Sequence, residues 1–279
     1  MGVAAQKATI NGESYNSLGQ ETFRVDMNAA DEFTKILTDN QAVKLVEEDI
    51  YSVLADPTIE HHYDRRAAVY DFLVGTRFYG WVAWGSYPID YFSFARESLT
   101  SGSSGRFLDV GCGSLIFTAA SYLESDRTIV AFDESLAMLR RARKRLLKLA
   151  GAVPERVVLL QGDLAYLPFR PNSFQTVLCM NVLHHIEDAA ALIANLKRLL
   201  TYDGRLHLTS LVYNNRFIGD RYLKALHATG EFARPRRSLE LRRILNQTLG
   251  ESVSYRVKGN MAFASAAMSC EGDFRKLNS

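Results

Sequence analysis

The sequence predicts an α/β fold: a Rossmann-like, seven-stranded, mostly parallel sheet with a C-terminal antiparallel hairpin and an N-terminal helical extension. From about residue 103 onward, short apolar runs alternate with amphipathic helical stretches, which is typical of βαβ units. Near the C-terminus, two alternating runs flank Gly259 and Asn260, which predicts a hairpin. Together these patterns indicate a mostly parallel sheet that ends in antiparallel strands.

Each element after residue 103 is expected from its local pattern. The second helix has the clearest limits, because Ser135 is a good N-cap and Gly151 readily ends a helix. The expected strands are 107–110, 128–132, 157–161, 176–180, 205–211, 253–258 and 261–267. The expected helices are 115–123, 135–150, 189–200 and 238–249.

The first 97 residues lack strand-like alternation and are expected to form helices and loops that close as a lid. The linker 100–105, rich in serine and glycine, marks the boundary region, and the main domain is predicted to cover the range 98–279. Residues 63–94 hold 11 aromatic side chains, including Trp81 and Trp84. Three interpretations stay open for them: a lid packed on the main domain, the lining of an apolar substrate pocket, and peripheral contact with a membrane.

Composition excludes several classes of protein. With 47% hydrophobic and 23% charged residues, the chain can bury a full core, and its net charge of +2 is too small to indicate a nucleic-acid partner. No apolar run approaches the ~18 residues of a membrane-spanning helix, and the N-terminus does not resemble a signal peptide. The three cysteines are scattered, so neither disulfides nor a metal site are expected, and the predicted location is cytoplasmic.

The strongest functional signal is the segment 107–113, Phe-Leu-Asp-Val-Gly-Cys-Gly. An apolar strand ends there in a tight turn that opens a helix. Because Gly111 and Gly113 have no Cβ, the backbone can turn sharply and a ligand can approach it closely. The helix start offers free N–H groups to an anionic group. Such a turn alone is also compatible with an ordinary strand-to-helix connection.

Acidic residues downstream give this turn more weight. Asp133 ends the second strand, 22 residues after Gly111, where an acid can accept hydrogen bonds from ribose hydroxyls. Asp163 follows the third strand, so Asp109, Asp133 and Asp163 are all expected at the carboxyl edge of the sheet. A dinucleotide would require a third glycine where Ile116 stands, which favours a cofactor without phosphates. An NAD(P)-dependent oxidoreductase is the alternative.

As a set, these segments resemble the class I S-adenosylmethionine (SAM)-dependent methyltransferases, and most closely the branch that includes ubiquinone and menaquinone biosynthesis enzymes. The resemblance covers roughly residues 63–268 and is specific for the fold and for SAM, but not for an acceptor. The matching segments are 108–114, 131–135 with Met138, 160–164, 167–169, 174–179, 181–186, 203–206 and the terminal hairpin.

The resemblance implies a set of residues that contact SAM. The glycine turn would line the pocket of the methionine end, Asp133 would hold the ribose, and Asp163 would bind the adenine amino group with Leu164 against the ring. Asn181 would lie beside the cofactor. The full expected set is Asp109, Gly111, Cys112, Gly113, Asp133, Glu134, Met138, Asp163, Leu164 and Asn181.

Three residues are candidates for catalysis. His184 and His185 could act as a general base at the substrate mouth, although a packing role under the loop is the commoner fate of such histidines. Neighbouring histidines are expected to point in different directions, so they are not expected to grip one metal ion. Tyr70 belongs to one of two Tyr-Asp pairs that resemble pairs preceding the catalytic domain in the same family.

The predicted function is SAM-dependent methyl transfer to a small acceptor with an apolar or aromatic character, such as a quinone, a lipid or a secondary metabolite. An alternative is a methyltransferase-like protein that binds SAM without transferring methyl. The helix over 135–150 also carries a strongly basic face. It is expected to be solvated, with contact to an anionic membrane or a partner as the alternative. No oligomeric state is predicted.

Overall fold

The computed structural model describes residues 33–39, 41–58, 79–102, 104–250 and 252–268, together with three short strands near the N-terminus. The chain divides into two compact units, Met1–Leu37 and Thr38–Ser279. In the first unit, β1 (Thr9–Ile10), β2 (Glu13–Tyr15) and β3 (Glu21–Thr22) form a small antiparallel sheet. All further description concerns the second unit.

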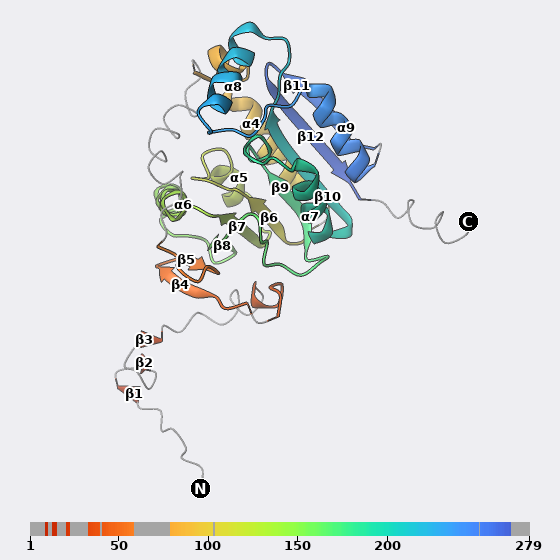
Figure 1. Ribbon diagram of the computed structural model, residues 1–279. Coiled ribbons are helices and arrows are strands. Elements are labelled where there is room, and N and C mark those ends of the chain that lie inside the picture. Colours follow the sequence, from red (N-terminus) through yellow and green to blue (C-terminus); the bar gives the residue numbers. More distant parts are fainter. Residues whose placement is uncertain are drawn as a thin grey trace, which may run out of the picture. The chain divides into compact units, whose positions relative to one another are not determined.

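The second unit is built on a nine-stranded sheet with the order β11-β12-β10-β9-β6-β7-β8-β5-β4 (Figure 1). Strands β5 to β10 pair in parallel, and β4, β11 and β12 are antiparallel to their neighbours. The strands are β4 (Lys44–Glu47), β5 (Ile50–Ser52), β6 (Phe107–Val110), β7 (Ile129–Asp133), β8 (Val157–Gln161), β9 (Phe174–Cys179), β10 (Leu200–Leu211), β11 (Ser254–Lys258) and β12 (Met261–Ala267). The predicted Rossmann-like sheet and its hairpin are confirmed.

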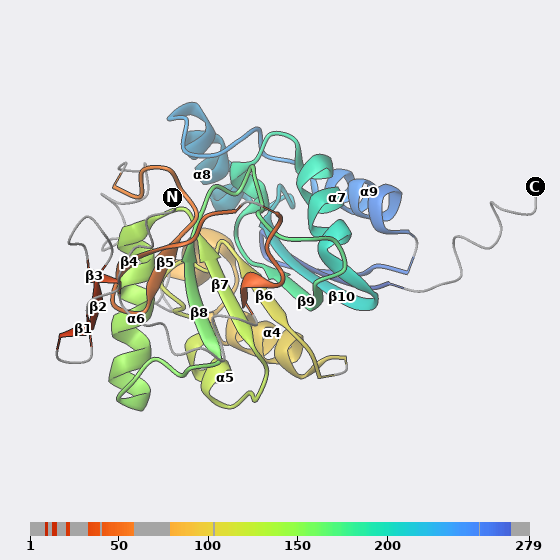
Figure 2. The same cartoon turned by 90° about the horizontal axis from the view of Figure 1, so that it is seen from below.

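Helices cover both faces of this sheet. Figure 2 shows α4, α5 and α6 on one face and α7 and α9 on the other. The helices are α4 (Pro88–Thr100), α5 (Ala119–Leu123), α6 (Leu136–Ala150), α7 (Ala189–Leu199), α8 (Phe217–Ala228) and α9 (Ser238–Leu249), with a π-helical turn η1 (Gly80–Trp84) and a 3-10 turn η2 (Leu183–His185). Within the described residues, no helix is long and apolar enough to cross a membrane.

Local signals set the limits of α6. The Ser135 side chain accepts a hydrogen bond from the Met138 N–H, and Gly151 takes the left-handed conformation at φ +79° after the last turn. The apolar stripe of the helix is buried at Leu139, Ala142 and Leu146. Every residue of β6, β7 and β8 is also buried, as expected for central strands of a parallel sheet.

The two strands β4 and β5 correct the expectation of seven strands and of an extension without strands. They come from the segment predicted to hold only helices and loops, yet β5 pairs in parallel with β8, for example Ile50 with Leu159. Their sequences are too short to show a pattern, so it is the pairing of β5 with β8, and of β4 with β5, that makes them strands. The domain boundary near residue 97 stays a prediction, and residues 59–78 lie outside the described residues.

The hairpin β4–β5 also pairs with the basic face of α6. Arg140 Nε donates to Glu47 Oε1 at 2.8 Å, and Arg143 Nε donates to Asp49 Oδ2 at 3.0 Å. Arg145 Nε binds the Ser114 carbonyl at 2.9 Å. Each exposed ion pair contributes under about 1 kcal/mol to stability. Together, however, these contacts engage arginines that would otherwise be available to an anionic membrane or a partner. These pairs therefore favour a solvated basic face on α6 over contact with an anionic membrane or a partner.

The terminal hairpin turn is tied to two other segments. Asn260 is fully buried, and its N–H donates to the Trp84 carbonyl at 2.7 Å. Its carbonyl accepts from the Val212 N–H at 2.8 Å, and its side-chain amide donates back to the Val212 carbonyl at 2.9 Å. The turn, the end of β10 and η1 are therefore held as one unit.

Replacement of Gly259 by alanine tests this close packing. Gly259 has φ +61°, and a Cβ there would lie 1.9 Å from the Trp84 carbonyl oxygen, so the turn must move. We expect Gly259→Ala to lower the free energy of unfolding by about 2–4 kcal/mol in urea denaturation. Gly151→Ala is the matched control, since its φ is +79° and its Cβ would meet no atom within 4 Å; about 1 kcal/mol is expected there. Equal losses would show that the Trp84 contact is unimportant.

Candidate functional site

The carboxyl ends of β6, β7, β8 and β9 bring the predicted residues to one edge of the sheet. The register pairs Asp109 with Ala131 and Asp133 with Gln161, so the first three strands end level with one another. The loops that follow these strands therefore face the same side, where ligands bind in open α/β sheets.

The two glycines of the turn after β6 serve different purposes. Gly111 has φ +68°, and a Cβ there would lie 2.3 Å from Val182 Cγ2, so this glycine lets the loop after β9 pack closely. Gly113 has φ +55°, and its Cβ would meet no atom within 4 Å. The backbone at Gly113 therefore faces open space, as a ligand-binding turn requires.

Asp133 connects this turn to its own loop. Its Oδ2 accepts a hydrogen bond from the Gly113 N–H at 2.8 Å, and its Oδ1 accepts from the Ser135 N–H at 2.9 Å. The side chain is buried. The carboxylate therefore connects the turn after β6 to the start of α6.

Asp109 is a buried acid with a strongly shifted pKa. It is 2% exposed, and the Tyr122 hydroxyl donates to its Oδ2 at 2.6 Å. The pKa of Asp109 is raised to about 7, mainly by burial; the Tyr122 hydrogen bond opposes this rise and the charge of Asp133 adds to it. Asp109 is therefore poised to ionise when a cationic group comes close.

A glutamine that the sequence analysis did not single out supports the loop after β7. Gln161 is fully buried, and its Nε2 donates to the carbonyls of Glu134 and Pro57, both at 3.1 Å. Gln161 thus links the backbone at Glu134 to the segment that follows β5. The sequence did contain a signal for this role: Gln161 is the one polar residue of the strand Val-Val-Leu-Leu-Gln and stands at its end. In the neighbouring loop, Asp163 Oδ1 accepts from the Ala165 N–H at 2.7 Å.

Asn181 is fixed by reciprocal hydrogen bonds with β10. Its N–H donates to Thr209 Oγ1 at 2.9 Å, and the Thr209 hydroxyl donates to Asn181 Oδ1 at 3.0 Å. The backbone at Asn181 has φ +59°, a left-handed conformation that asparagine tolerates better than most residues. Thr209 was not predicted as part of the site.

The remaining predicted cofactor residues differ in exposure. Met138 is buried in α6, whereas Cys112 and Leu164 are half-buried in the loops of the edge. Burial raises the pKa of the Cys112 thiol well above its ordinary value, and the charges of Asp133 and Asp109 act in the same direction. The thiol is therefore neutral.

The two histidines lie side by side, contrary to the expectation that they point apart. Their ring centroids are 4.4 Å apart, and both rings contact Phe232, because the 3-10 turn η2 presents them to one apolar surface. His184 is 7% exposed, and its Nδ1 accepts from the Leu211 N–H at 3.3 Å. Burial lowers the pKa of His184 well below its ordinary value, with the charges of His185 and Arg236 adding to this. This geometry favours packing for His184.

His185 has a different environment. It is half-buried, and its Nδ1 lies 3.2 Å from the Glu231 carbonyl oxygen. A carbonyl can only accept, so the ring proton lies on Nδ1 and the basic lone pair lies on Nε2. Of the two histidines, His185 is the less buried. Tyr70 lies outside the described residues.

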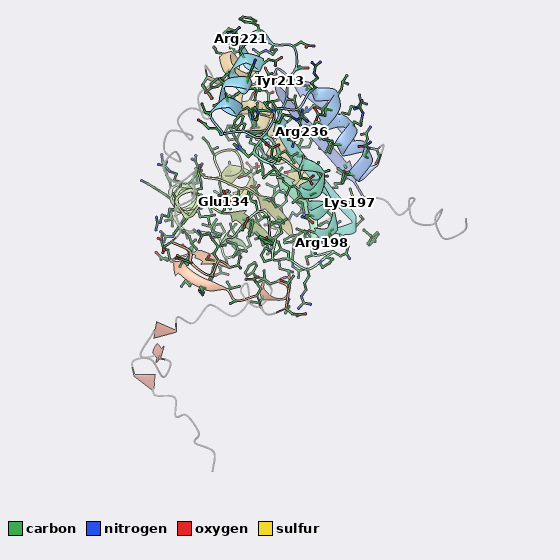
Figure 3. All side chains as sticks on the ribbon, viewed as in Figure 1. Glu134, Lys197, Arg198, Tyr213, Arg221 and Arg236 are labelled. Atoms are coloured by element: carbon green, nitrogen blue, oxygen red, sulfur yellow. The ribbon has the colours of Figure 1, made fainter. Side chains whose placement is uncertain are left out.

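Arg236 holds the loop that carries both histidines. Its guanidinium donates to the carbonyls of Leu183 at 3.0 Å, Ile186 at 2.6 Å and Glu187 at 2.5 Å, and the side chain is buried. In Figure 3, Glu134 lies beside α6 and Arg236 lies apart from it, toward α8 and α9. The geometry of this loop therefore depends on a residue far along the chain.

Comparison with known proteins agrees with this geometry. Residues 108–208 match the family model described as a methyltransferase domain. Over this segment the chain is similar to methyltransferase domains. The predicted resemblance is thereby confirmed, and the NAD(P) oxidoreductase alternative is not favoured.

Relatives and solved structures extend the match. The chain is 30% identical to an uncharacterized chloroplastic methyltransferase of Arabidopsis thaliana, over 51% of this chain and 41% of that protein. It is also 30% identical to a ubiquinone biosynthesis O-methyltransferase of Xanthomonas euvesicatoria, over 48% of this chain and 58% of that one. The chain thus spans about half the length of these relatives.

One solved structure with the same fold is phosphoethanolamine N-methyltransferase 2 of Haemonchus contortus, in complex with phosphomonomethylethanolamine and S-adenosylhomocysteine. Its TM-score is 0.59 at 16% identity, and the match covers 74% of this chain and 58% of that one. This likeness confirms the Rossmann-like methyltransferase fold.

The shifted pKa of Asp109 predicts a stability that depends on pH. The folded-state pKa of about 7 lies above the ordinary 3.8, so the proton favours the folded protein and the stabilisation is lost as the pH rises toward 7. Between pH 5 and 7.5 we expect wild type to lose about 2–3 kcal/mol of unfolding free energy relative to Asp109→Asn, which cannot titrate. Urea denaturation of both proteins at each pH measures this difference. A constant difference would mean that Asp109 has an ordinary pKa.

Proposed function

We propose that this chain transfers a methyl group from SAM to a small acceptor of apolar or aromatic character, such as a quinone, a lipid or a secondary metabolite. The observation that carries the proposal is the meeting of Asp109, Gly113 and Asp133 at one sheet edge within the matched methyltransferase segment. A protein that binds SAM without transferring methyl stays the second candidate.

The residues of the edge fit the chemistry of SAM. Gly113 leaves room against its backbone, and Asp133 offers two oxygens suited to ribose hydroxyls. A buried carboxyl such as Asp109, with its pKa raised to about 7, suits the cationic amino acid end, because a nearby positive charge would favour the ionised form. Asp163 is half-buried, as expected of a group that binds the adenine amino group.

Bound SAM supplies a methyl carbon on a positively charged sulfur, a good leaving group for direct displacement. The protein then has to hold donor and acceptor in line, and orientation alone can supply much of the rate. Gly111, Asp133 and Asn181 fix the donor side through their loops. Where the acceptor is an un-ionised hydroxyl, His185 is the proposed base, with Nε2 taking the proton. His184 and Tyr70 stay weaker candidates.

An aromatic wall supports the proposed character of the acceptor. Trp84 of η1 stacks on Tyr222 of α8 with centroids 5.1 Å apart, and Tyr79 meets both rings edge-on. The Tyr79 and Tyr222 hydroxyls lie 3.2 Å apart. The described part of the aromatic segment thus packs on the helix after β10. The name of the Xanthomonas relative, an O-methyltransferase of ubiquinone biosynthesis, also supports an aromatic acceptor.

Replacement of Asp133 by asparagine tests the cofactor site. The variant loses the charged acceptors for ribose and for the Gly113 N–H, so we expect binding of S-adenosylhomocysteine to weaken by about 1–3 kcal/mol in titration calorimetry. Asp126→Asn is the control, because Asp126 is exposed and lies before the first residue of β7, whereas Asp133 is the last residue of that strand. Unchanged affinity in Asp133→Asn would remove Asp133 from the site.

A screen of acceptor classes with methyl-labelled SAM tests the reaction. We expect label to enter an apolar or aromatic compound and not a nucleic acid, and we expect His185→Gln to slow transfer to a hydroxyl by about 10²-fold or more, with little change in affinity for S-adenosylhomocysteine. The control is His227→Gln, an exposed histidine on α8. Cofactor binding without label in any acceptor would favour the second candidate.

A further inference from the structure

A hollow of about 540 Å³ lies beyond the end of β10, between α8 and the start of α9. Tyr213 and Arg221 lie near one another at this end of the protein (Figure 3). The side chains that decide its chemistry are Tyr213, Asp220, Arg221, Lys224, Arg237 and Leu239. None of these residues has a role predicted from the sequence.

The walls of the hollow are held by backbone hydrogen bonds. Tyr213 N–H donates to the Arg236 carbonyl at 2.9 Å, and Ser238 N–H donates to the Tyr213 carbonyl at 3.1 Å, which places Arg237 opposite Tyr213. Asn214 Nδ2 donates to the Gly259 carbonyl at 2.7 Å. The positions of the walls are therefore set by the backbone and do not depend on the conformations of exposed side chains.

Three cations line this hollow without a carboxylate partner. Arg221 and Lys224 lie three residues apart on α8 and so share a face, and Arg237 comes from the opposite wall. None of them forms an ion pair with any residue the structure describes. The basic side chains Arg140 and Arg143 on α6, in contrast, are paired with acids of the β4–β5 hairpin.

One acid lies among these cations and is already engaged. Asp220 Oδ1 accepts from Asn260 Nδ2 at 2.6 Å and from the Asn214 N–H at 3.2 Å. Its single charge offsets one of the three positive charges, so the hollow stays positive. A bound anion with several oxygens would relieve the repulsion between the remaining cations and could form charge-assisted hydrogen bonds with them.

We infer that this hollow binds the anionic end, a phosphate or a carboxylate, of the methyl acceptor. Leu239, 73% exposed, and Phe217 under the Arg221 guanidinium place apolar surface beside the charge, which suits a compound with an apolar body. The hollow follows the carboxyl end of β10, the strand whose Thr209 holds Asn181. This inference rests on the proposed function, because it places acceptor and donor at one sheet edge.

The experiment measures binding of phenyl phosphate and benzoate to the full chain saturated with S-adenosylhomocysteine, by calorimetry at low salt. The test variant is Arg221→Gln/Lys224→Gln/Arg237→Gln. The control, Lys144→Gln/Lys148→Gln/Arg243→Gln, removes the same charge from exposed positions outside the hollow. We expect the test variant to raise the Kd of phenyl phosphate by about tenfold or more and the control by less than about twofold, with the affinity for S-adenosylhomocysteine unchanged in both.

Equal weakening in both variants would show non-specific attraction and overturn the inference. The inference would also be overturned if the protein bound phosphatidylglycerol vesicles but not phenyl phosphate, because the ligand would then be a lipid surface. If the test variant alone loses phenyl phosphate but wild type methylates no acceptor, the anion site stands and the proposed function fails. If an acceptor without a charged group is methylated equally well by wild type and the test variant, and phenyl phosphate does not bind, the proposed function stands and the anion site fails.

Discussion

The carboxylate of Asp133 joins the two loops on which the rest of the edge depends. Through Gly113 it fixes the turn after β6, and through Ser135 it fixes the start of α6. A single side chain thus sets the position of the open backbone at Gly113 and of the first turn of α6. Such a group cannot be replaced by a merely polar residue without moving the turn, because only a carboxylate accepts on both oxygens.

The other half of the edge is organised by a buried cation. Arg236 satisfies three carbonyls of the loop after β9, and this loop in turn packs against Gly111 through Val182. The bridge of Tyr213 to Arg237 continues directly from Arg236. The turn after β6, the loop with the two histidines and the basic hollow are therefore connected through neighbouring residues.

Much of the fold could be predicted where local chemistry decides it. The limits of α6 follow from Ser135 and Gly151, and the parallel strands follow from continuous apolar runs. Strands β4 and β5 could not be predicted, because β5 exists through its pairing with β8 and β4 through its pairing with β5. Helix α8 was also missed, since its amphipathic pattern is interrupted by exposed Phe217 and Ile218. At the site, the acids were identifiable from spacing, whereas Gln161, Thr209 and Arg236 act through contacts that only the folded chain creates.

The pairing of β5 with β8 has a consequence for the minimal folding unit. Without residues 44–58, β8 would present a bare row of N–H and C=O groups, a template for unwanted strand addition by another molecule. The amide of Gln161 would also lose the Pro57 carbonyl. The segment that matches the methyltransferase family, residues 108–208, is thus shorter than the sheet it belongs to, and the early segment moves the exposed edge of that sheet from β8 to β4.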